Sequence, residues 1–366
     1  MTGSPRALVI GAGPAGLAAA ACLQREGVPF RLVDRRGVAG GAFNLMYRGV
    51  TLMSPARYTS LPGLKLRVRG EYVTAPQYRD YLQRYVCLHR LNVERAEVER
   101  VERVRRGFRV TFMGDGEPCL FDAVVVATGM FDCPIRPSIE DLRAAEDSGA
   151  ELEVMHARDW RGPENFRGRR LLIVGAASSG VELAEECARA GVAVTVSARS
   201  GIRVAAQRFL GRDVHDYAYR IFDRIPVWLL GSYCSRRPTL PGIDLGFRRF
   251  VREGLIVVRG LVTVIDGRRV KFADSHDAEF DAVVLATGYQ FRTPFLPDSV
   301  ARAAAGHPLS RNGESTSWEG LFVLGMPCAR TVSSEFLYGI ARDAPEVARQ
   351  VRARLGRTSF DERRLS

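Results

Sequence analysis

Three glycines near the start of the chain stand at intervals that suit the binding of a phosphate group. Gly11, Gly13 and Gly16 follow the apolar run 7–10 and precede a helical pattern, an order typical of a strand, a tight turn and a helix. The first glycine permits the bend, the second lets a pyrophosphate approach the backbone, and the third allows close packing of helix on strand. The anion then lies at the positive end of the helix that starts near Pro14.

A carboxylate follows at the distance that a dinucleotide requires. Asp34 ends a second apolar segment, residues 30–34. At the end of a second parallel strand, its side chain can accept hydrogen bonds from both hydroxyls of an adenosine ribose. The glycines alone are a weak signal. With both strands, the helix and the acid in place, they predict a dinucleotide site rather than a plain structural turn.

The pattern of strand, glycine turn and helix recurs in the second half of the chain. An apolar run ends before Gly175, Gly180 completes the turn, and residues 193–197 form the next expected strand. Ala177 replaces the middle glycine, so a methyl group faces the pyrophosphate. Two such units in one chain greatly reduce the odds of a chance match.

The second copy also lacks the acid. Counted from the first glycine, the position of Asp34 corresponds to Ala198, which cannot bind ribose hydroxyls, and Arg199 and Arg203 follow. A guanidinium here favours a nucleotide with a 2′-phosphate, so the sequence predicts NADPH rather than NADH at this unit. The alternative is that both arginines are simply solvated, as others are in this arginine-rich chain.

Length and composition exclude several other classes of protein. The chain of 366 residues is long enough for two domains. No apolar run approaches the ~18 residues that a membrane span needs, and we expect a cytoplasmic protein. The net charge is +12, but the arginines are spread along the whole chain, so we expect no nucleic-acid partner. The seven cysteines are never spaced as C-x-x-C, which argues against a disulfide framework, a zinc site and a dithiol redox centre.

Further segments must position the two units. Residues 75–89 carry apolar residues at helical spacing, residues 93–121 alternate like short strands, and residues 122–126 form an apolar strand. A proline-containing linker then indicates a domain boundary, and a last helix at about 334–355 is expected to dock on the first domain. The aromatic residues between 215 and 233 suit a substrate pocket, although core packing is the more common reason for such a concentration.

Five short motifs carry a family resemblance. They comprise Gly11, Gly13 and Gly16 with Asp34; Gly40, Gly41, Ala42 and Phe43; Ala127, Thr128 and Gly129; the second turn ending in Ser179 and Gly180; and Ala286, Thr287, Gly288 and Tyr289. Together they resemble the two-dinucleotide flavoprotein monooxygenases, which include flavin-containing, N-hydroxylating and Baeyer–Villiger enzymes. The resemblance covers nearly the whole chain, and residues 54–58 are most similar to short bacterial members.

The resemblance implies an α/β fold of two Rossmann-like domains, the second inserted into the first. It places FAD in a discontinuous domain of residues 1–160 and 286–366, and NADPH in a domain of residues 161–285. It also implies the chemistry. Hydride from NADPH reduces the flavin, oxygen adds at the flavin C4a position, and the resulting (hydro)peroxide oxygenates nitrogen, sulfur or a ketone of a small molecule.

The motifs and the resemblance together indicate one set of cofactor-binding positions. These are Gly11, Gly13, Pro14, Ala15, Gly16, Asp34, Arg35, Gly41, Ala42, Phe43, Ser54, Val98, Thr128, Gly129, Gly175, Ser178, Ser179, Gly180, Arg199, Thr287, Gly288, Tyr289 and Met326. No catalytic side chain and no metal ligand is assigned, because the cofactors carry the chemistry. The expected partners are a small-molecule substrate and molecular oxygen, and a homodimer is left open.

Departures from the family pattern keep other functions open. The family has a sequence fingerprint before the second glycine turn, and this chain retains only His156 and Trp160 of it. Met53 stands where many relatives have an asparagine that contacts the flavin. A flavin dehydrogenase or oxidase is therefore an alternative, and so is a non-catalytic flavoprotein. A reductase of the thioredoxin-reductase type is a weaker alternative, because C-x-x-C is missing and Met326 replaces an aspartate.

Overall fold

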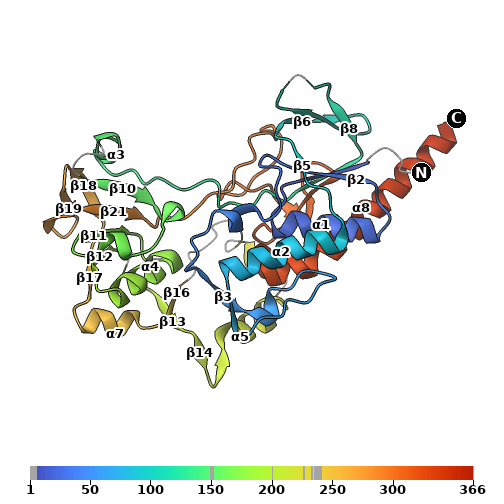
Figure 1. The fold of residues 1–366 in the computed structure, drawn as a ribbon. Helices are drawn as coiled ribbons and strands as arrows, with labels where there is room; N and C mark the ends of the chain where they lie inside the picture. Colours follow the sequence, from blue (N-terminus) through green and yellow to red (C-terminus); the bar gives the residue numbers. More distant parts are fainter. Residues whose placement is uncertain are drawn as a thin grey trace.

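Two β-sheets, one for each glycine turn, form the framework of the chain (Figure 1). The second sheet is parallel, and the first has a parallel centre with antiparallel strands at one edge. The computed structural model describes residues 6–114, 116–148, 152–199, 201–225, 227–231, 234 and 241–365. In Figure 1 the first sheet and its helices lie on the right and the second sheet lies on the left. The fold is α/β with two Rossmann-like units, which confirms the predicted fold class.

The first sheet is built around β1, which pairs in parallel with β2 on one side and β9 on the other. Its strand order is β22-β23-β24-β9-β1-β2-β5. The strands are β1 (Ala7–Ile10), β2 (Phe30–Asp34), β5 (Glu94–Arg95), β9 (Ala123–Val126), β22 (Ser310–Arg311), β23 (Glu314–Ser315) and β24 (Leu321–Val323). The carboxyl ends of the parallel strands meet at one edge, where a ligand binds in such sheets.

Alternate residues of β1 enter different cores. Ala7 and Val9 pack with three helices, whereas Leu8 and Ile10 pack with a three-stranded meander on the opposite face. The helices are α1 (Pro14–Arg25), α2 (Ala75–His89) and α8 (Leu337–Leu365), and the meander comprises β6 (Val98–Val104), β7 (Gly107–Phe112) and β8 (Cys119–Phe121). Burial of both faces explains why this strand is a continuous apolar run. The predicted helix at 75–89 and the docking of the last helix are confirmed.

The second sheet repeats this plan around β11, with the order β10-β21-β11-β12-β17. Its strands are β10 (Glu153–His156), β11 (Arg170–Val174), β12 (Ala193–Ser197), β17 (Ile256–Arg259) and β21 (Ala282–Leu285). Leu171 and Ile173 face the core beneath α4 (Ser178–Arg189) and α7 (Phe247–Arg252). Leu172 and Val174 face the core that contains α3 (Leu142–Ser148) and the meander β18 (Val262–Asp266), β19 (Arg269–Phe272) and β20 (Asp277–Glu279).

The chain leaves the first sheet after β9, builds the second sheet, and returns to the first through β22, β23 and β24, so the second unit is inserted into the first. Strand β10 lies within residues 1–160, the range that the sequence assigned to the first domain, yet it pairs with β21 in the second sheet. The strand therefore belongs to the second unit. It was misplaced because its four residues carry no alternating pattern.

A carboxylate on α4 makes the stability of the second unit depend on pH. Burial, and then repulsion from Glu185 and Glu186, raises the pKa of Glu182 from its ordinary 4.5 to about 7. Because the folded state holds this proton more tightly than the unfolded chain does, stability falls as the pH rises from about 4.5 to about 7.

We expect Glu182→Gln to raise the stability at pH 8 by about 2–3 kcal/mol, since each unit of pKa shift corresponds to about 1.4 kcal/mol. At pH 4.5 the variant and the wild type should unfold together. Thermal unfolding recorded from pH 4.5 to 8 measures both. Glu99→Gln, at an exposed position, is the matched control. Parallel curves for Glu182→Gln and the wild type would contradict this explanation.

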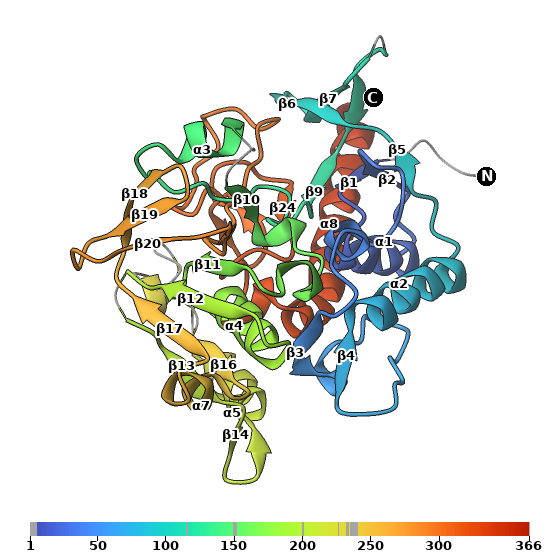
Figure 2. The same ribbon diagram turned by 60° about the vertical axis from the view of Figure 1, so that its left-hand side comes forward.

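A segment of the second unit reaches across to the first unit (Figure 2). We call residues 204–222 the insert; they contain β13 (Val204–Ala206), the hairpin β14 (Arg208–Phe209) and β15 (Arg212–Asp213), and α5 (Val214–Phe222). Beyond the insert, Cys234 forms a disulfide with Cys328, which follows β24. Cysteine spacing argued against a disulfide framework, and it gave no indication of this single bond. Partners 94 residues apart leave no local spacing signal.

The disulfide is expected to contribute measurably to stability. A cross-link that closes a loop of this length typically contributes about 2–4 kcal/mol, chiefly by restricting the unfolded chain. We expect Cys234→Ser to lower the unfolding midpoint in denaturant, and reductant to bring the wild type to the same value. Cys87→Ser, which removes an exposed free thiol, should change neither. A wild type that is insensitive to reductant would show that the bond adds no stability.

Within the described part of the chain, no helix has both the length and the apolar character to cross a membrane.

Candidate functional site

The first glycine turn has the close contacts that its glycines predict. Gly11 has a φ of +104°, and a methyl group on it would lie 2.6 Å from the carbonyl oxygen of Ala127. A methyl group on Gly16 would lie 1.7 Å from the carbonyl oxygen of Gly11. Helix α1 therefore packs directly on the end of β1, and neither glycine can be replaced without moving backbone.

Gly13 is required for a different reason. Its φ of −75° is open to any residue, and a methyl group on it would meet only the Cα of Gly41, at 3.9 Å. The space that a side chain would occupy at Gly13 thus faces the second glycine loop, at η1 (Gly41–Asn44). No side chain caps the start of α1, so its first amides are free to bind a pyrophosphate between the two loops.

Asp34 is fixed in place by backbone amides. Its Oδ2 accepts a hydrogen bond from the amide of Ala12 at 3.0 Å, and its Oδ1 accepts one from the amide of Arg36 at 2.8 Å. Each oxygen keeps a lone pair for a ribose hydroxyl. The side chains of Arg35 and Arg36 both pair with Asp132. Burial raises the pKa of Asp132, but these two guanidinium groups hold it below its ordinary value.

The remaining predicted FAD positions differ in how far their side chains are buried. Phe43, Val98 and Met326 bury their side chains in the cores. Gly325 packs on Ala15, which places the loop after β24 over the start of α1. Among the described residues, the hydroxyl of Thr128 is buried without a hydrogen-bond partner. An orphaned donor beside Gly11 fits a site that a bound group completes.

The second glycine turn repeats the geometry of the first. Gly175 has a φ of +114°, and a methyl group on Gly180 would lie 1.9 Å from the carbonyl oxygen of Gly175. Ala177 has φ −84° and ψ −172°, nearly the values of −75° and −175° at Gly13. The alanine therefore reduces the space beside the turn, but it does not strain the backbone. Ser178 and Ser179 begin α4, whose N-terminus also lacks a side-chain cap.

Two exposed arginines stand beyond the end of β12. Arg199 and Arg203 are both exposed, and neither forms an ion pair with an acid in the described parts of the chain. Ala198 occupies the position that Asp34 holds in the first unit, and no carboxylate takes its place. Unpaired guanidinium groups at this edge fit a nucleotide that carries an extra phosphate.

The two chain crossings between the sheets lie side by side. The hydroxyl of Thr287 donates to the carbonyl of Ile135, and the amide of Ile135 donates to the carbonyl of Gly288 at 2.9 Å. Tyr289 contacts both Phe131 and His156, with ring centroids 5.0 Å apart in each pair. Burial lowers the pKa of His156, which keeps the ring neutral at physiological pH. Trp160 donates to Glu186 at 3.0 Å, so these retained fingerprint residues hold the junction and the second unit.

The contact between the insert and the first unit is not predicted by any sequence pattern. The hydroxyl of Tyr219 on α5 lies 2.9 Å from that of Ser54 on β3 (Thr51–Pro55). Tyr219 also stacks on Tyr338 of α8 at 4.5 Å and meets Tyr58 edge-on at 5.0 Å. The aromatic concentration at 215–233 therefore supplies interface packing at Tyr219. Tyr233 lies outside the described residues.

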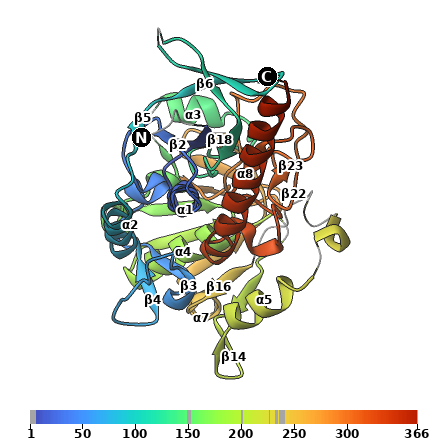
Figure 3. The ribbon, with the colours of Figure 1, turned by 90° about the vertical axis from the view of Figure 1, so that its right-hand side faces the viewer.

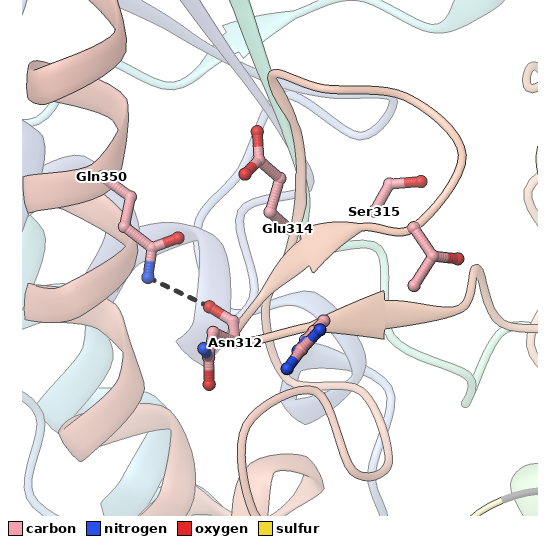
Figure 4. Close-up of a pocket in the computed structure, with 6 residues that line it drawn as sticks. Asn312, Glu314, Ser315 and Gln350 are labelled. Carbon is pink, nitrogen blue, oxygen red and sulfur yellow. Dashed lines mark hydrogen bonds between the residues drawn. The ribbon is translucent and has the colours of Figure 1, made fainter.

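One surface depression does not involve the predicted positions. It has a volume of about 490 Å³ and lies between the hairpin β22–β23 and α8 (Figure 4). Its lining is polar and consists of Arg311, Asn312, Glu314, Ser315, Thr316 and Gln350. The amide of Gln350 donates to the carbonyl of Asn312 at 3.1 Å. None of the predicted cofactor-binding residues lines it.

Known proteins share both the sequence pattern and the fold. Residues 8–214 match the family described as pyridine nucleotide-disulphide oxidoreductase. A probable indole-3-pyruvate monooxygenase of Arabidopsis thaliana is 27% identical over 94% of this chain and 88% of its own length. An indole-3-pyruvate monooxygenase of Oryza sativa subsp. japonica is 28% identical over 95% and 91%.

Solved structures agree on the arrangement of the two units. A flavin-containing monooxygenase from Stenotrophomonas maltophilia superposes with a TM-score of 0.78 at 23% identity, covering 95% of this chain and 98% of that chain. Thioredoxin reductase from T. acidophilum superposes with a TM-score of 0.60 at 17% identity, covering 95% and 97%. Both glycine turns lie inside the matched range, residues 8–214, and the chain belongs to the pyridine nucleotide-disulphide oxidoreductase family.

Proposed function

We propose that this chain is an NADPH-dependent FAD monooxygenase that oxygenates a small molecule at nitrogen, sulfur or a ketone. The main support for the proposal is that the two glycine turns differ in the residues that would contact a nucleotide. The first combines Gly13 with a fixed Asp34, whereas the second combines Ala177 with the unpaired Arg199. A tightly held nucleotide suits the first turn, and a phosphate-bearing nucleotide that comes and goes suits the second. The monooxygenase names of the full-length relatives support the same reaction class.

Each part of the proposal has its own residues. The amides at the start of α1 hold the FAD pyrophosphate, Asp34 holds the adenosine ribose, and the loop at Met326 covers the start of the helix. Helix α4 holds the NADPH pyrophosphate, and Arg199 holds its 2′-phosphate. When bound, the two cofactors supply hydride transfer and oxygen activation. The protein orients them and excludes water, which is why no nucleophile and base pair is needed.

Turnover with labelled oxygen tests the proposal. The purified protein is reduced with NADPH without oxygen and then mixed with ¹⁸O₂ and a panel of thioethers, amines and ketones. We expect the flavin absorbance to bleach, one labelled atom to enter the product and the other to form water. Complete reoxidation to hydrogen peroxide, with no labelled product, would instead indicate a flavin oxidase. A flavin that NADPH never bleaches would leave only a non-catalytic flavoprotein.

A further inference from the structure

A leucine occupies the exposed tip of the β14–β15 hairpin, where its side chain is not buried by folding. Leu210 and Gly211 form the two-residue turn, with φ values of +47° and +74°. Turns of this kind favour asparagine or glycine, because a side chain in the left-handed region is strained. The side chain of Leu210 is nevertheless 81% exposed. A strained and exposed apolar residue is best explained by a contact made outside the folded chain.

The exposed leucine continues into an apolar strip. Phe209 is 60% exposed and its ring meets that of Tyr217 edge-on at 5.9 Å. Ile221 lies one helical turn beyond Tyr217 on α5 and is 56% exposed. The hairpin projects from the molecule in all three ribbon views, and Figure 3 shows it below α5. We call Phe209, Leu210, Tyr217 and Ile221 the apolar strip.

Acidic and basic side chains around the strip face in different directions. The three acids of residues 203–224 turn inward. Asp213 accepts from Tyr72 and from the ring of His215, Asp216 pairs with Arg57, and Asp223 pairs with Arg342. The arginines of the same segment are exposed, and these are Arg203, Arg208, Arg212, Arg220 and Arg224. Arg208 also reaches Glu71. The outer surface of the insert is therefore apolar and basic.

We propose that the apolar strip and its arginines bind an anionic lipid surface, with the hairpin tip inserted among the headgroups. Apolar side chains flanked by guanidinium groups match this environment, because the tip enters the acyl boundary while the arginines reach phosphate groups. A symmetric contact with a second copy is disfavoured. It would set the same arginines against one another.

Vesicle co-sedimentation of the full-length protein tests the proposal without cofactor turnover. The probe is a vesicle of phosphatidylcholine with about 30 mol% phosphatidylglycerol. We expect the protein to bind it, and to bind vesicles of phosphatidylcholine alone at least about tenfold more weakly. Leu210→Asn is the decisive variant, since asparagine tolerates the left-handed turn. It should keep or raise the unfolding midpoint while it weakens binding about fivefold or more. Arg212→Gln with Arg220→Gln should weaken binding in the same way.

Control variants distinguish binding by this surface from nonspecific binding through exposed apolar or basic residues elsewhere. Leu120→Ser removes a leucine that is 65% exposed on β8, and Arg100→Gln removes an exposed arginine on β6. Neither should alter sedimentation. The proposal is overturned if no vesicle binds, or if Leu210→Asn sediments like the wild type. It is also overturned if analytical ultracentrifugation shows self-association that Leu210→Asn abolishes while vesicle binding persists, because a second copy would then be the occupant. Oxygenation of substrate in the absence of vesicles remains a separate measurement, so either proposal can fail alone.

Discussion

Gly13→Ala is expected to weaken FAD binding about tenfold or more while leaving the folded chain intact, a loss of about 1.4 kcal/mol or more. The added methyl group meets no protein atom closer than 3.9 Å, and the residue already has a conformation that alanine adopts freely. The methyl group instead takes space between the two glycine loops, where the pyrophosphate lies in our proposal. Binding is measured by titrating the apoprotein with FAD and following flavin fluorescence.

Gly16→Ala is the contrasting variant. Its methyl group would lie 1.7 Å from the carbonyl oxygen of Gly11, so α1 must move away from β1. Overpacking against backbone costs about 1–3 kcal/mol or more, and we expect the thermal unfolding midpoint of the apoprotein to fall. If Gly13→Ala lowered this midpoint as much as Gly16→Ala does, the space at Gly13 would be structural and would not serve a ligand.

Arg199→Ala is expected to lower kcat/KM for NADPH about tenfold to a hundredfold and to change kcat/KM for NADH less than about twofold. The reason is that hydrogen bonds to a charged group typically contribute about 1.5–3 kcal/mol, and only NADPH carries the 2′-phosphate. Anaerobic flavin reduction, followed at several concentrations of each nucleotide, measures both values.

Arg252→Ala is the matched control for this variant. Arg252 is an exposed arginine of the same unit, at the end of α7, and its removal should affect neither nucleotide. An equal loss for NADPH and NADH in Arg199→Ala would argue against the phosphate assignment. Arg203 would then be the next residue to test, because it is exposed at the same edge.

The sequence predicted the two units because their requirements are local. The φ of +104° at Gly11 and the contact of Gly16 with the carbonyl oxygen of Gly11 both lie within a single turn, and Asp34 lies at the end of the next strand. These distances along the chain are fixed by the lengths of one strand and one helix. The same reasoning identified Ala177 as a change in the space around the ligand, and its backbone angles agree with this interpretation.

The features that the sequence did not predict depend on distant parts of the chain. The pairing of β10 with β21 joins residues more than a hundred positions apart, and the Cys234–Cys328 bond spans 94. The contact between Tyr219 and Ser54 depends on how the insert reaches the first unit. No periodicity or spacing encodes such pairs, because a short pattern reports burial and turns but not the partner across the fold.

The insertion of the second unit has a consequence for how the chain folds during synthesis. The second sheet is complete once β21 has emerged, whereas the first sheet still lacks β24 and the core of α1 lacks the side chains of α8. The N-terminal half of the first unit must therefore wait for the last segment to be made, with the apolar face of α1 uncovered in the meantime. In most proteins the N-terminal domain folds first. Here the middle of the chain is expected to be native before either end.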